Sequence, residues 1–211
     1  MVIKSTDFKR IFCVGRNYIN HAKELNNQIP KSPVIFMKPA TCLVSSETKT
    51  IQRIVNEEIH YETELVLVVG REGYYTESDN IDNTIMGYSL GLDLTLRQVQ
   101  RQLTEKGLPW EKSKSFDHSS PIGKIIPINS CDEIRKLEFA CYVNNEKRQH
   151  GQVSNMIFSF EAILKEISRY WKLIPGDLIY TGTPEGVGIL HPGDSIRIES
   201  QQTGPFEWKM G

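Results

Sequence analysis

The sequence predicts an α+β fold in which β-strands predominate. Short apolar or alternating segments, each closed by glycine, proline or a polar turn, recur along the chain, whereas helical spacing of apolar residues occurs in only three places. Two similar Pro-Gly-Asp turns, at residues 175–177 and 192–194, each lead into a strand-like segment. Many short strands with few helices are typical of an α+β fold dominated by sheet.

The expected strands are short and are set apart by turn residues. Residues 65–69 are continuously apolar and end at Gly70, which is typical of a buried strand. Asn144 and Asn145 predict a tight hairpin turn between two of the segments. The strands are therefore expected at residues 10–15, 34–37, 65–69, 84–92, 137–144, 147–150, 178–180 and 195–198.

Helical spacing of apolar residues covers residues 16–25, 95–106 and 159–171. Side chains that accept hydrogen bonds favour the start of a helix, so we expect Asn17 or Asn20, Thr95 and Ser159 to cap these three. Gly107 is expected to end the second helix, because glycine readily adopts the left-handed conformation found there.

Length and composition limit the class of protein. The chain has 211 residues, which suits a single well-buried domain spanning residues 1–211. Its net charge is −1 with no basic block, so we expect no nucleic acid partner and no binding to an anionic membrane. Apolar runs are too short to span a bilayer, the first residues lack the apolar core of a signal peptide, and the four cysteines lack C-x-x-C spacing. These features predict a cytoplasmic protein with reduced thiols.

Two carboxylates stand at the beginning of the apolar strand at residues 65–69. Glu62 and Glu64 are separated by one residue, so on a strand they face the same way, about 6.5–7 Å apart along the chain. Two such carboxylates repel each other and resist burial, and a bound cation would relieve both effects. The alternative is that the end of the strand is solvated and both glutamates face water.

Asp93 ends the next apolar segment and completes a set of three oxygen ligands. Oxygen-only coordination favours Mg²⁺, Mn²⁺ or Ca²⁺ over zinc. Three carboxylates leave about half of an octahedral shell for water or substrate, which is typical of a catalytic metal site. Spacing alone leaves both the shared metal and the solvated alternative open.

The chain resembles the fumarylacetoacetate hydrolase (FAH) family, in its short, single-domain acylpyruvase-like branch. Each matching segment is weak alone, but together they occur in family order and cover nearly the whole chain. The segments are Cys-Val-Gly-Arg-Asn-Tyr at 13–18 followed by His21 and Glu24, Phe-Met-Lys-Pro at 36–39, Tyr-Glu-Thr-Glu-Leu at 61–65, residues 87–93, Gly-Leu-Pro-Trp at 107–110, Lys-Ser-Phe-Asp at 114–117, Pro-Gly-Asp at 175–177, and Thr-Gly-Thr-Pro-Glu-Gly-Val-Gly at 181–188. The resemblance implies an FAH-type mixed β-sandwich or β-roll with a few short helices.

The resemblance also implies the roles of the charged residues. Glu62, Glu64 and Asp93 would hold Mg²⁺ or Mn²⁺, with Ca²⁺ as an alternative. His21 and Glu24 correspond to the family's catalytic pair, in which the carboxylate orients the imidazole and raises its basicity. Lys114 matches the active-site lysine, whose charge suits an anionic keto acid and its enolate.

A further group of residues is implied to bind substrate. Gln100 matches a polar contact, and the loop at residues 181–188 is expected to contact the substrate carboxylate through its backbone, including Gly182, and through Thr183. Arg16 either holds substrate or braces a lid, and the sequence does not separate these roles. Residues 16–30 are expected to form that mobile lid.

The implied function is a metal-dependent hydrolase that cleaves a carbon–carbon bond in acylpyruvate-type β-diketo acids, such as acetylpyruvate or fumarylpyruvate, through a metal-bound pyruvate enolate. The same site would also serve oxaloacetate decarboxylation or tautomerisation, or a 2-keto diacid isomerase or hydratase. A non-catalytic dimeric binding protein is a further alternative. The small-molecule partner is therefore a keto acid, and the resemblance alone implies a homodimer. Unlike the larger fumarylacetoacetase proper, the chain lacks an extra N-terminal domain and a further carboxylate ligand, and residues 201–211 match the family poorly.

Overall fold

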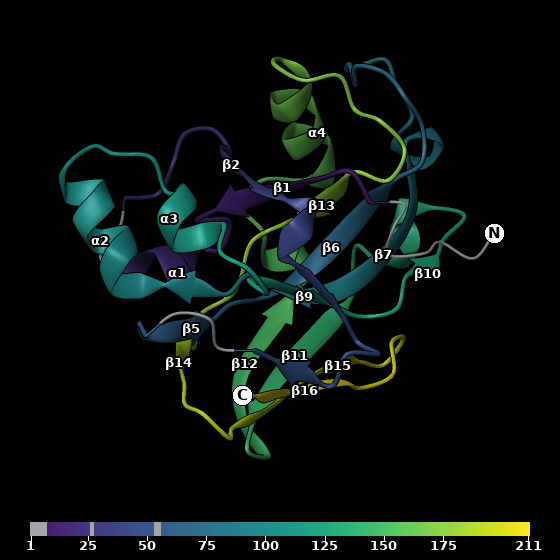
Figure 1. Cartoon of the computed structure of the whole chain (residues 1–211). Coiled ribbons are helices and arrows are strands. Elements are labelled where there is room, and N and C mark those ends of the chain that lie inside the picture. The colour runs from purple at the N-terminus through teal and green to yellow at the C-terminus, as the bar shows by residue number, and fades with distance from the viewer. Residues whose placement is uncertain (1–7, 26–27, 53–55) are drawn as a thin grey trace.

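The computed structural model describes residues 8–25, 28–52 and 56–211 (Figure 1). Within these ranges the chain forms sheets of eight, five and three strands, and its helices are short. The predicted α+β class with mainly β structure is confirmed.

The largest sheet contains the strands whose ends carry the residues of the functional site. Most neighbouring strands in this sheet are antiparallel, whereas β1 and β13 are parallel, as are β3 and β9. Its order is β2 (Val34–Pro39), β1 (Arg10–Gly15), β13 (Leu178–Tyr180), β6 (Thr63–Val69), β7 (Ile85–Leu92), β9 (Ser120–Ile122) and β3 (Leu43–Ser45), with β10 (Ile126–Pro127) also pairing with β7.

The other two sheets are smaller. Asn144 and Asn145 have φ values of 51° and 65°, so both central residues of the predicted hairpin turn are left-handed, as the twist of a two-residue hairpin requires. The five-stranded sheet runs β12 (Glu146–Gln152), β11 (Glu138–Val143), β15 (Ser195–Ser200), β16 (Phe206–Met210) and β4 (Thr50–Ile51). The three-stranded sheet runs β14 (Gly188–Leu190), β5 (Ile59–Tyr61) and β8 (Thr95–Leu96).

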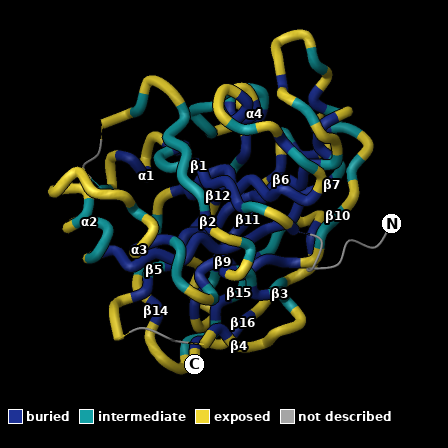
Figure 2. The backbone as a smooth tube through the Cα atoms, turned by 45° about the horizontal axis from the view of Figure 1, so that its top comes forward, coloured by how far each residue is buried: buried dark blue, intermediate teal, exposed yellow. Residues whose placement is uncertain are grey.

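Strand β6 lies inside the molecule, and all seven of its residues are buried. Successive side chains of a strand point to opposite faces, so Leu65 and Leu67 join the larger apolar cluster while Val66 and Val68 join the smaller one. Figure 2 shows buried positions concentrated in the central strands and exposed positions in the connecting loops. The apolar run at residues 65–69 is therefore a buried strand, as predicted.

Helices α1 (Ile19–Glu24), α2 (Arg97–Glu105) and α3 (Glu111–Lys114) gather at one side of the sheets, and α4 (Phe160–Ser168) packs elsewhere (Figure 1). The longest helices in the described ranges have nine residues, which is too few to cross a bilayer.

The predicted helix starts are right for α4 and wrong for α1 and α2. The hydroxyl of Ser159 accepts a hydrogen bond from the backbone N–H of Ala162, as predicted. Neither Asn17 nor Asn20 caps α1, because Tyr18 precedes this helix without a capping side chain. Thr95 lies in β8, and Leu96 precedes α2 instead.

The sequence did not predict α3 or several short strands, which are β3, β4, β5, β8, β9, β10, β14 and β16. Helix α3 has only four residues, so it leaves no periodic pattern in the sequence. The poorly matching segment at residues 201–211 contains β16, in which Trp208 is completely buried and donates from Nε1 to the carbonyl of Ser45 at 3.2 Å. Trp208 and Met210 of this segment are part of the apolar core.

Candidate active site

Three buried carboxylates meet where β6 begins and β7 ends. Antiparallel pairing sets Thr63 opposite Leu92, so the next residues outward, Glu62 and Asp93, also face each other, and Asp93 N donates to Glu62 O at 2.8 Å. Alternation along the strand puts Glu64 on the same side as Glu62. One oxygen from each of Glu62, Glu64 and Asp93 lies within 4.8 Å of the others. The register of the sheet therefore builds the predicted cluster.

Glu64 is the carboxylate of this cluster without an ion pair to any described residue. Its Oε2 accepts a hydrogen bond of 2.8 Å from the backbone N–H of Gly182, whose φ of +102° favours glycine. Burial, and then the charges of Asp93 and Glu62, hold the pKa of Glu64 well above its usual range. A positive charge at this point would allow the carboxylate to ionise.

Three cationic side chains contact the other two carboxylates. Lys114 Nζ lies 2.7 Å from Glu62 Oε2, from Asp93 Oδ2 and from Thr95 Oγ1. Arg97 forms an ion pair with Glu62, and Lys38 forms one with Asp93 in which Nζ lies 2.6 Å from Oδ1. Burial raises the pKa of Glu62, but Lys114 and Arg97 outweigh it and hold this pKa below its usual range. Burial opposes the charge of Lys114, yet Asp93 and Glu62 raise its pKa.

The donor set fits a hard divalent cation. All three groups are carboxylates, whose oxygens are the ligands that Mg²⁺, Mn²⁺ and Ca²⁺ prefer. The buried Asp93 Oδ1 accepts no hydrogen bond from the described residues, although it forms an ion pair with the ammonium of Lys38. A metal ion would coordinate this oxygen of Asp93 and the carboxylate of Glu64, which has no ion pair.

His21 and Glu24 lie on one face of α1, as their spacing predicts. His21 is 4% exposed, and its Nδ1 lies 3.3 Å from Glu24 Oε2. Glu24 Oε1 accepts a hydrogen bond of 3.1 Å from the backbone N–H of Gly186. Burial raises the pKa of Glu24, but the hydrogen bonds with His21 and Gly186 together lower it by more. The pKa of Glu24 therefore lies below its usual value.

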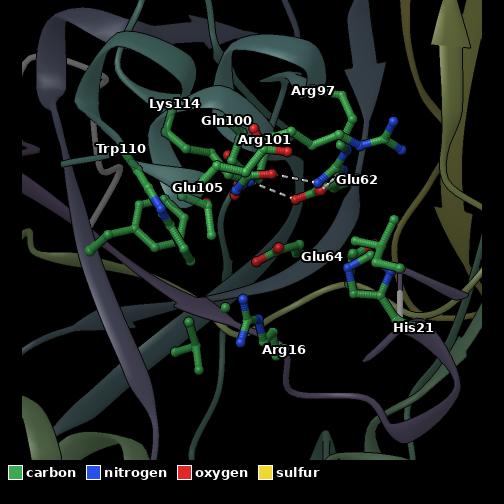
Figure 3. A pocket seen from close by; sticks show the side chains of 17 residues that line it. Arg16, His21, Glu62, Glu64, Arg97, Gln100, Arg101, Glu105, Trp110 and Lys114 are labelled. Carbon is green, nitrogen blue, oxygen red and sulfur yellow. Dashed lines mark hydrogen bonds and ion pairs between the residues drawn. The ribbon is translucent and has the colours of Figure 1, made fainter. Parts of the chain in front are cut away.

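Most of the predicted site residues line one cavity of about 190 Å³. Figure 3 shows Glu64 near its centre, with His21 and Arg16 on one side and Lys114 and Gln100 on the other. The predicted residues on its wall are Arg16, His21, Glu62, Glu64, Asp93, Gln100, Lys114 and Thr183. Glu24 and Gly182 are outside this wall, and each contacts a residue that belongs to it.

Arg16 and Gln100 differ in how they are held. Arg16 has a φ of 62°, a conformation that costs free energy for a residue other than glycine and is concentrated at functional sites. Its guanidinium forms no hydrogen bond or ion pair with the described residues. The side-chain oxygen of Gln100 accepts a hydrogen bond of 2.7 Å from Arg97. The structure describes residues 16–25 and 28–30 of the predicted lid, and residues 26–27 lie outside the described part.

The hydroxyl of Thr183 is engaged within the protein. Gln149 Oε1 accepts from Thr63 N at 3.0 Å and its Nε2 donates to Pro184 O at 3.0 Å, so the orientation of this amide is fixed by the backbone. Its Nε2 also donates to Thr183 Oγ1 at 2.9 Å, and Thr183 donates to Thr63 O at 2.9 Å. A carboxylate bound at Thr183 would require this hydroxyl to turn away from Thr63.

Sequence reasoning missed Lys38, Arg97 and Gln149. Lys38 directly follows the apolar residues 34–37 and belongs to the matched Phe-Met-Lys-Pro segment, and this position was the available signal. Arg97 precedes Gln100 by three residues and so shares its helical face. Gln149 lies in an otherwise charged segment and carries no comparable signal.

Comparison with known proteins agrees with this geometry. The family model for the fumarylacetoacetate (FAA) hydrolase C-terminal region matches residues 10–210. The chain is 38% identical over 188 residues to the mitochondrial oxaloacetate tautomerase FAHD1 of Rattus norvegicus. The aligned region covers 89% of this chain and 85% of that protein. The chain is also 38% identical over 190 residues to the mitochondrial oxaloacetate decarboxylase of Dictyostelium discoideum, spanning 90% of this chain and 87% of that protein.

Among solved structures, the chain is similar to fumarylpyruvate hydrolase from Pseudomonas aeruginosa in complex with Mn²⁺ and pyruvate. The two superpose with a TM-score of 0.90 at 34% sequence identity, covering 96% of this chain and 89% of that one. The family model, the sequence matches and the solved structure all indicate the same family. This chain belongs to the fumarylacetoacetate hydrolase family.

Proposed function

We propose that this protein is a divalent-metal-dependent enzyme that hydrolyses a carbon–carbon bond in acylpyruvate-type β-diketo acids. One observation carries the proposal: a buried imidazole, His21, is held by a carboxylate, Glu24, on the wall of the cavity that contains the acidic cluster. A protein that only binds a keto acid has no need of such a base. The likeness to a fumarylpyruvate hydrolase whose structure holds Mn²⁺ and pyruvate supports the same reaction class.

Glu62, Glu64 and Asp93 would hold Mg²⁺ or Mn²⁺, with Ca²⁺ as a less suitable alternative. When bound, the ion supplies a fixed positive charge that polarises ligand oxygens and stabilises negative charge on them. The carboxylates come from adjacent strands of one sheet, so their positions are set before any ligand arrives.

His21 acts as the general base in this proposal. When its Nδ1–H donates a hydrogen bond to Glu24, the neutral imidazole keeps a lone pair on Nε2, which can take a proton from water. The water oxygen then bonds to the distal carbonyl carbon of the substrate, and the adjacent carbon–carbon bond breaks. Its electron pair stays on the pyruvate fragment as an enolate, which gains a proton to give pyruvate.

Lys114 and Arg16 supply positive charge for the anionic parts of the substrate. Lys114 lies 2.7 Å from oxygens of both Glu62 and Asp93, so its charge lies beside the proposed metal site, where enolate charge would develop. Arg16 forms no ion pair with the described residues and points into the cavity (Figure 3), where its planar guanidinium suits a carboxylate.

A second candidate is tautomerisation or decarboxylation of oxaloacetate, because two relatives at 38% identity carry the names oxaloacetate tautomerase and oxaloacetate decarboxylase. Tautomerisation needs the same base, which would take a proton from the carbon between the two carbonyl groups instead of from water. Decarboxylation also leaves a pyruvate enolate, so Lys114 would serve it equally well.

A substrate panel tests these proposals. The purified protein is incubated with acetylpyruvate, fumarylpyruvate and oxaloacetate, each with Mg²⁺ and with Mn²⁺, and pyruvate release and enol absorbance are followed. We expect pyruvate release from the two acylpyruvates, with oxygen from isotopically labelled water in the acid product. Turnover of oxaloacetate alone would favour the second candidate. No turnover of any substrate, while oxalate still binds, would leave a binding protein.

The expected homodimer, the single domain and the mobile lid at residues 16–30 are further parts of the proposal. Light scattering after gel filtration measures the oligomeric state. Hydrogen exchange with and without oxalate tests the lid, since closure over a ligand would slow exchange in α1.

A further inference from the structure

Lys38 is the most deeply buried of the charged groups around the acidic cluster. Its side chain is 0% exposed, and Lys38 does not line the cavity, although Phe36 of the same strand, β2, does. Its Nζ donates to the carbonyl of Ser119 at 2.7 Å and to that of Leu94 at 3.3 Å, and lies 2.6 Å from Asp93 Oδ1. Backbone carbonyls do not move away when a ligand binds. The charge of Lys38 is therefore fixed beside Asp93.

Lys114 is held differently. It lies on the cavity wall, and its partners are the side chains of Glu62, Asp93 and Thr95. Such side chains can exchange partners when a ligand enters. Lys38 contacts the other oxygen of the same Asp93 carboxylate and is not among the residues that line the cavity. One lysine can respond to a ligand, and the other cannot.

With Glu64 ionised, as it would be beside a bound cation, the formal charges of the buried cluster cancel. Glu62, Glu64 and Asp93 bring three negative charges, and Lys38, Lys114 and Arg97 bring three positive charges, all on buried side chains. A divalent cation added to this cluster leaves two positive charges without a counter-ion. Net charge in a buried site is costly because water no longer screens it.

Other charges at the cavity do not remove this excess. Arg16 lines the cavity and adds a positive charge, while Glu24, beside the neutral imidazole of His21, adds a negative one, so these two charges offset each other. Arg101 and Glu105 lie at the exposed mouth and are opposite in sign. The ligand itself is the remaining source of two negative charges.

We propose that Lys38 makes divalent-metal binding at this site depend on a dianionic ligand. The diacids and the acylpyruvate enolates of the proposed function both carry the two negative charges that this coupling requires. This inference rests on the proposed function and adds to it a role for Lys38. Because coupling between two ligands is reciprocal, the metal strengthens binding of the dianion by the same factor as the dianion strengthens binding of the metal.

Isothermal titration calorimetry tests the coupling without any turnover. Mg²⁺ is titrated into the wild-type protein alone, with saturating oxalate, a dianion, and with saturating oxamate, a monoanion of nearly the same shape. We expect oxalate to tighten Mg²⁺ binding about 10-fold or more beyond the effect of oxamate, within the usual range of coupling between sites. Equal effects of the two anions would overturn the proposal.

The variant Lys38→Met assigns the effect to this residue. Methionine keeps most of the length of lysine and removes its charge, so the cluster gains a net negative charge. We expect Mg²⁺ to bind this variant more tightly than the wild type when no anion is present, and the difference between oxalate and oxamate to shrink. Lys172→Met is the matched control, since Lys172 pairs with Glu72 on the surface, and it should behave as the wild type.

The outcomes separate this inference from the proposed function. A Lys38→Met protein that folds, as judged by circular dichroism, but keeps the wild-type difference between the anions would overturn the role of Lys38. If this variant does not fold, the wild-type comparison of oxalate with oxamate still decides the dependence on a dianion. Failure of every substrate in the panel, with the anion dependence intact, would remove the catalytic function and leave the charge coupling in place.

Discussion

Glu62 and Asp93 face each other across the antiparallel pair of β6 and β7, and Lys114 Nζ lies 2.7 Å from a carboxylate oxygen of each. Their positions follow from strand register, since Asp93 N donates to Glu62 O at 2.8 Å. A slip of one residue would turn each side chain to the opposite face of the sheet. The acidic cluster is therefore as rigid as the central sheet that carries it.

Gly182→Ala should both destabilise the protein and weaken the metal site. A Cβ at this position would lie 2.6 Å from Asn17 Cβ, and φ is +102°. We expect a loss of more than about 1 kcal/mol in the free energy of unfolding, since the native conformation excludes the new side chain. The shifted N–H would also release Glu64, so Mn²⁺ affinity should fall.

Gly193→Ala is the matched control for this change. Gly193 has a similar φ of +88°, but a Cβ there would have nothing within 4 Å. It should cost only the left-handed conformation, about 1–2 kcal/mol, and leave Mn²⁺ affinity unchanged. Equal losses of metal affinity in the two variants would show that Gly182 does not position Glu64 for metal binding.

Stability should fall as the pH decreases from about 6.5 to about 4, in part through His60. Burial, and then repulsion from Arg97, lower the pKa of His60 from 6.5 to about 4. Between these pH values His60 is protonated in the unfolded chain but not in the folded protein. The free energy of unfolding therefore decreases as the pH decreases. Above pH 6.5 the contribution is fully present.

Urea unfolding at several pH values measures this effect. His60→Gln should flatten the dependence on pH between 6.5 and 4, whereas His150→Gln, at an exposed position, should keep the wild-type slope. A His60→Gln protein with an unaltered slope would show that the folded state accommodates the charged imidazole.

His21→Ala should reduce turnover by about 10²- to 10⁴-fold, the usual contribution of a general base. His21 is not one of the three residues proposed to bind the metal, so the affinity for Mn²⁺ should be unchanged. Steady-state kinetics with the best substrate of the panel and calorimetry with Mn²⁺ check the two halves of this expectation. Turnover equal to that of the wild type would exclude His21 as the base.

The parts of the fold that depend on local pattern could be predicted from the sequence. The alternation and apolar runs gave the central strands, and the paired asparagines Asn144 and Asn145 gave a hairpin turn whose backbone is left-handed at both positions. Glu62, Glu64 and Asp93 stood out because carboxylates at the ends of buried strands are costly without a partner.

The parts that depend on distant contacts could not be predicted. Asn17 was expected to cap α1, but its Oδ1 accepts from Phe158 N at 2.7 Å and its Nδ2 donates to Thr181 O at 2.8 Å, both far away in sequence. Thr95 was expected to cap α2, and its hydroxyl instead accepts from Lys114. Lys38 meets Asp93 only because β2 and the end of β7 converge, which no local pattern encodes.

Binding of Mn²⁺ to the metal-free wild-type protein and to Glu64→Gln, measured by calorimetry, tests the central claim most directly. Glutamine keeps the shape of Glu64 and removes the charge of the carboxylate that has no cationic partner among the described residues. We predict one ion per chain in the wild type and an affinity at least about 10- to 100-fold weaker in the variant, as for the loss of groups that support a metal site. Equal affinities, or no binding to the wild type with oxalate present, would contradict a metal ion at Glu62, Glu64 and Asp93.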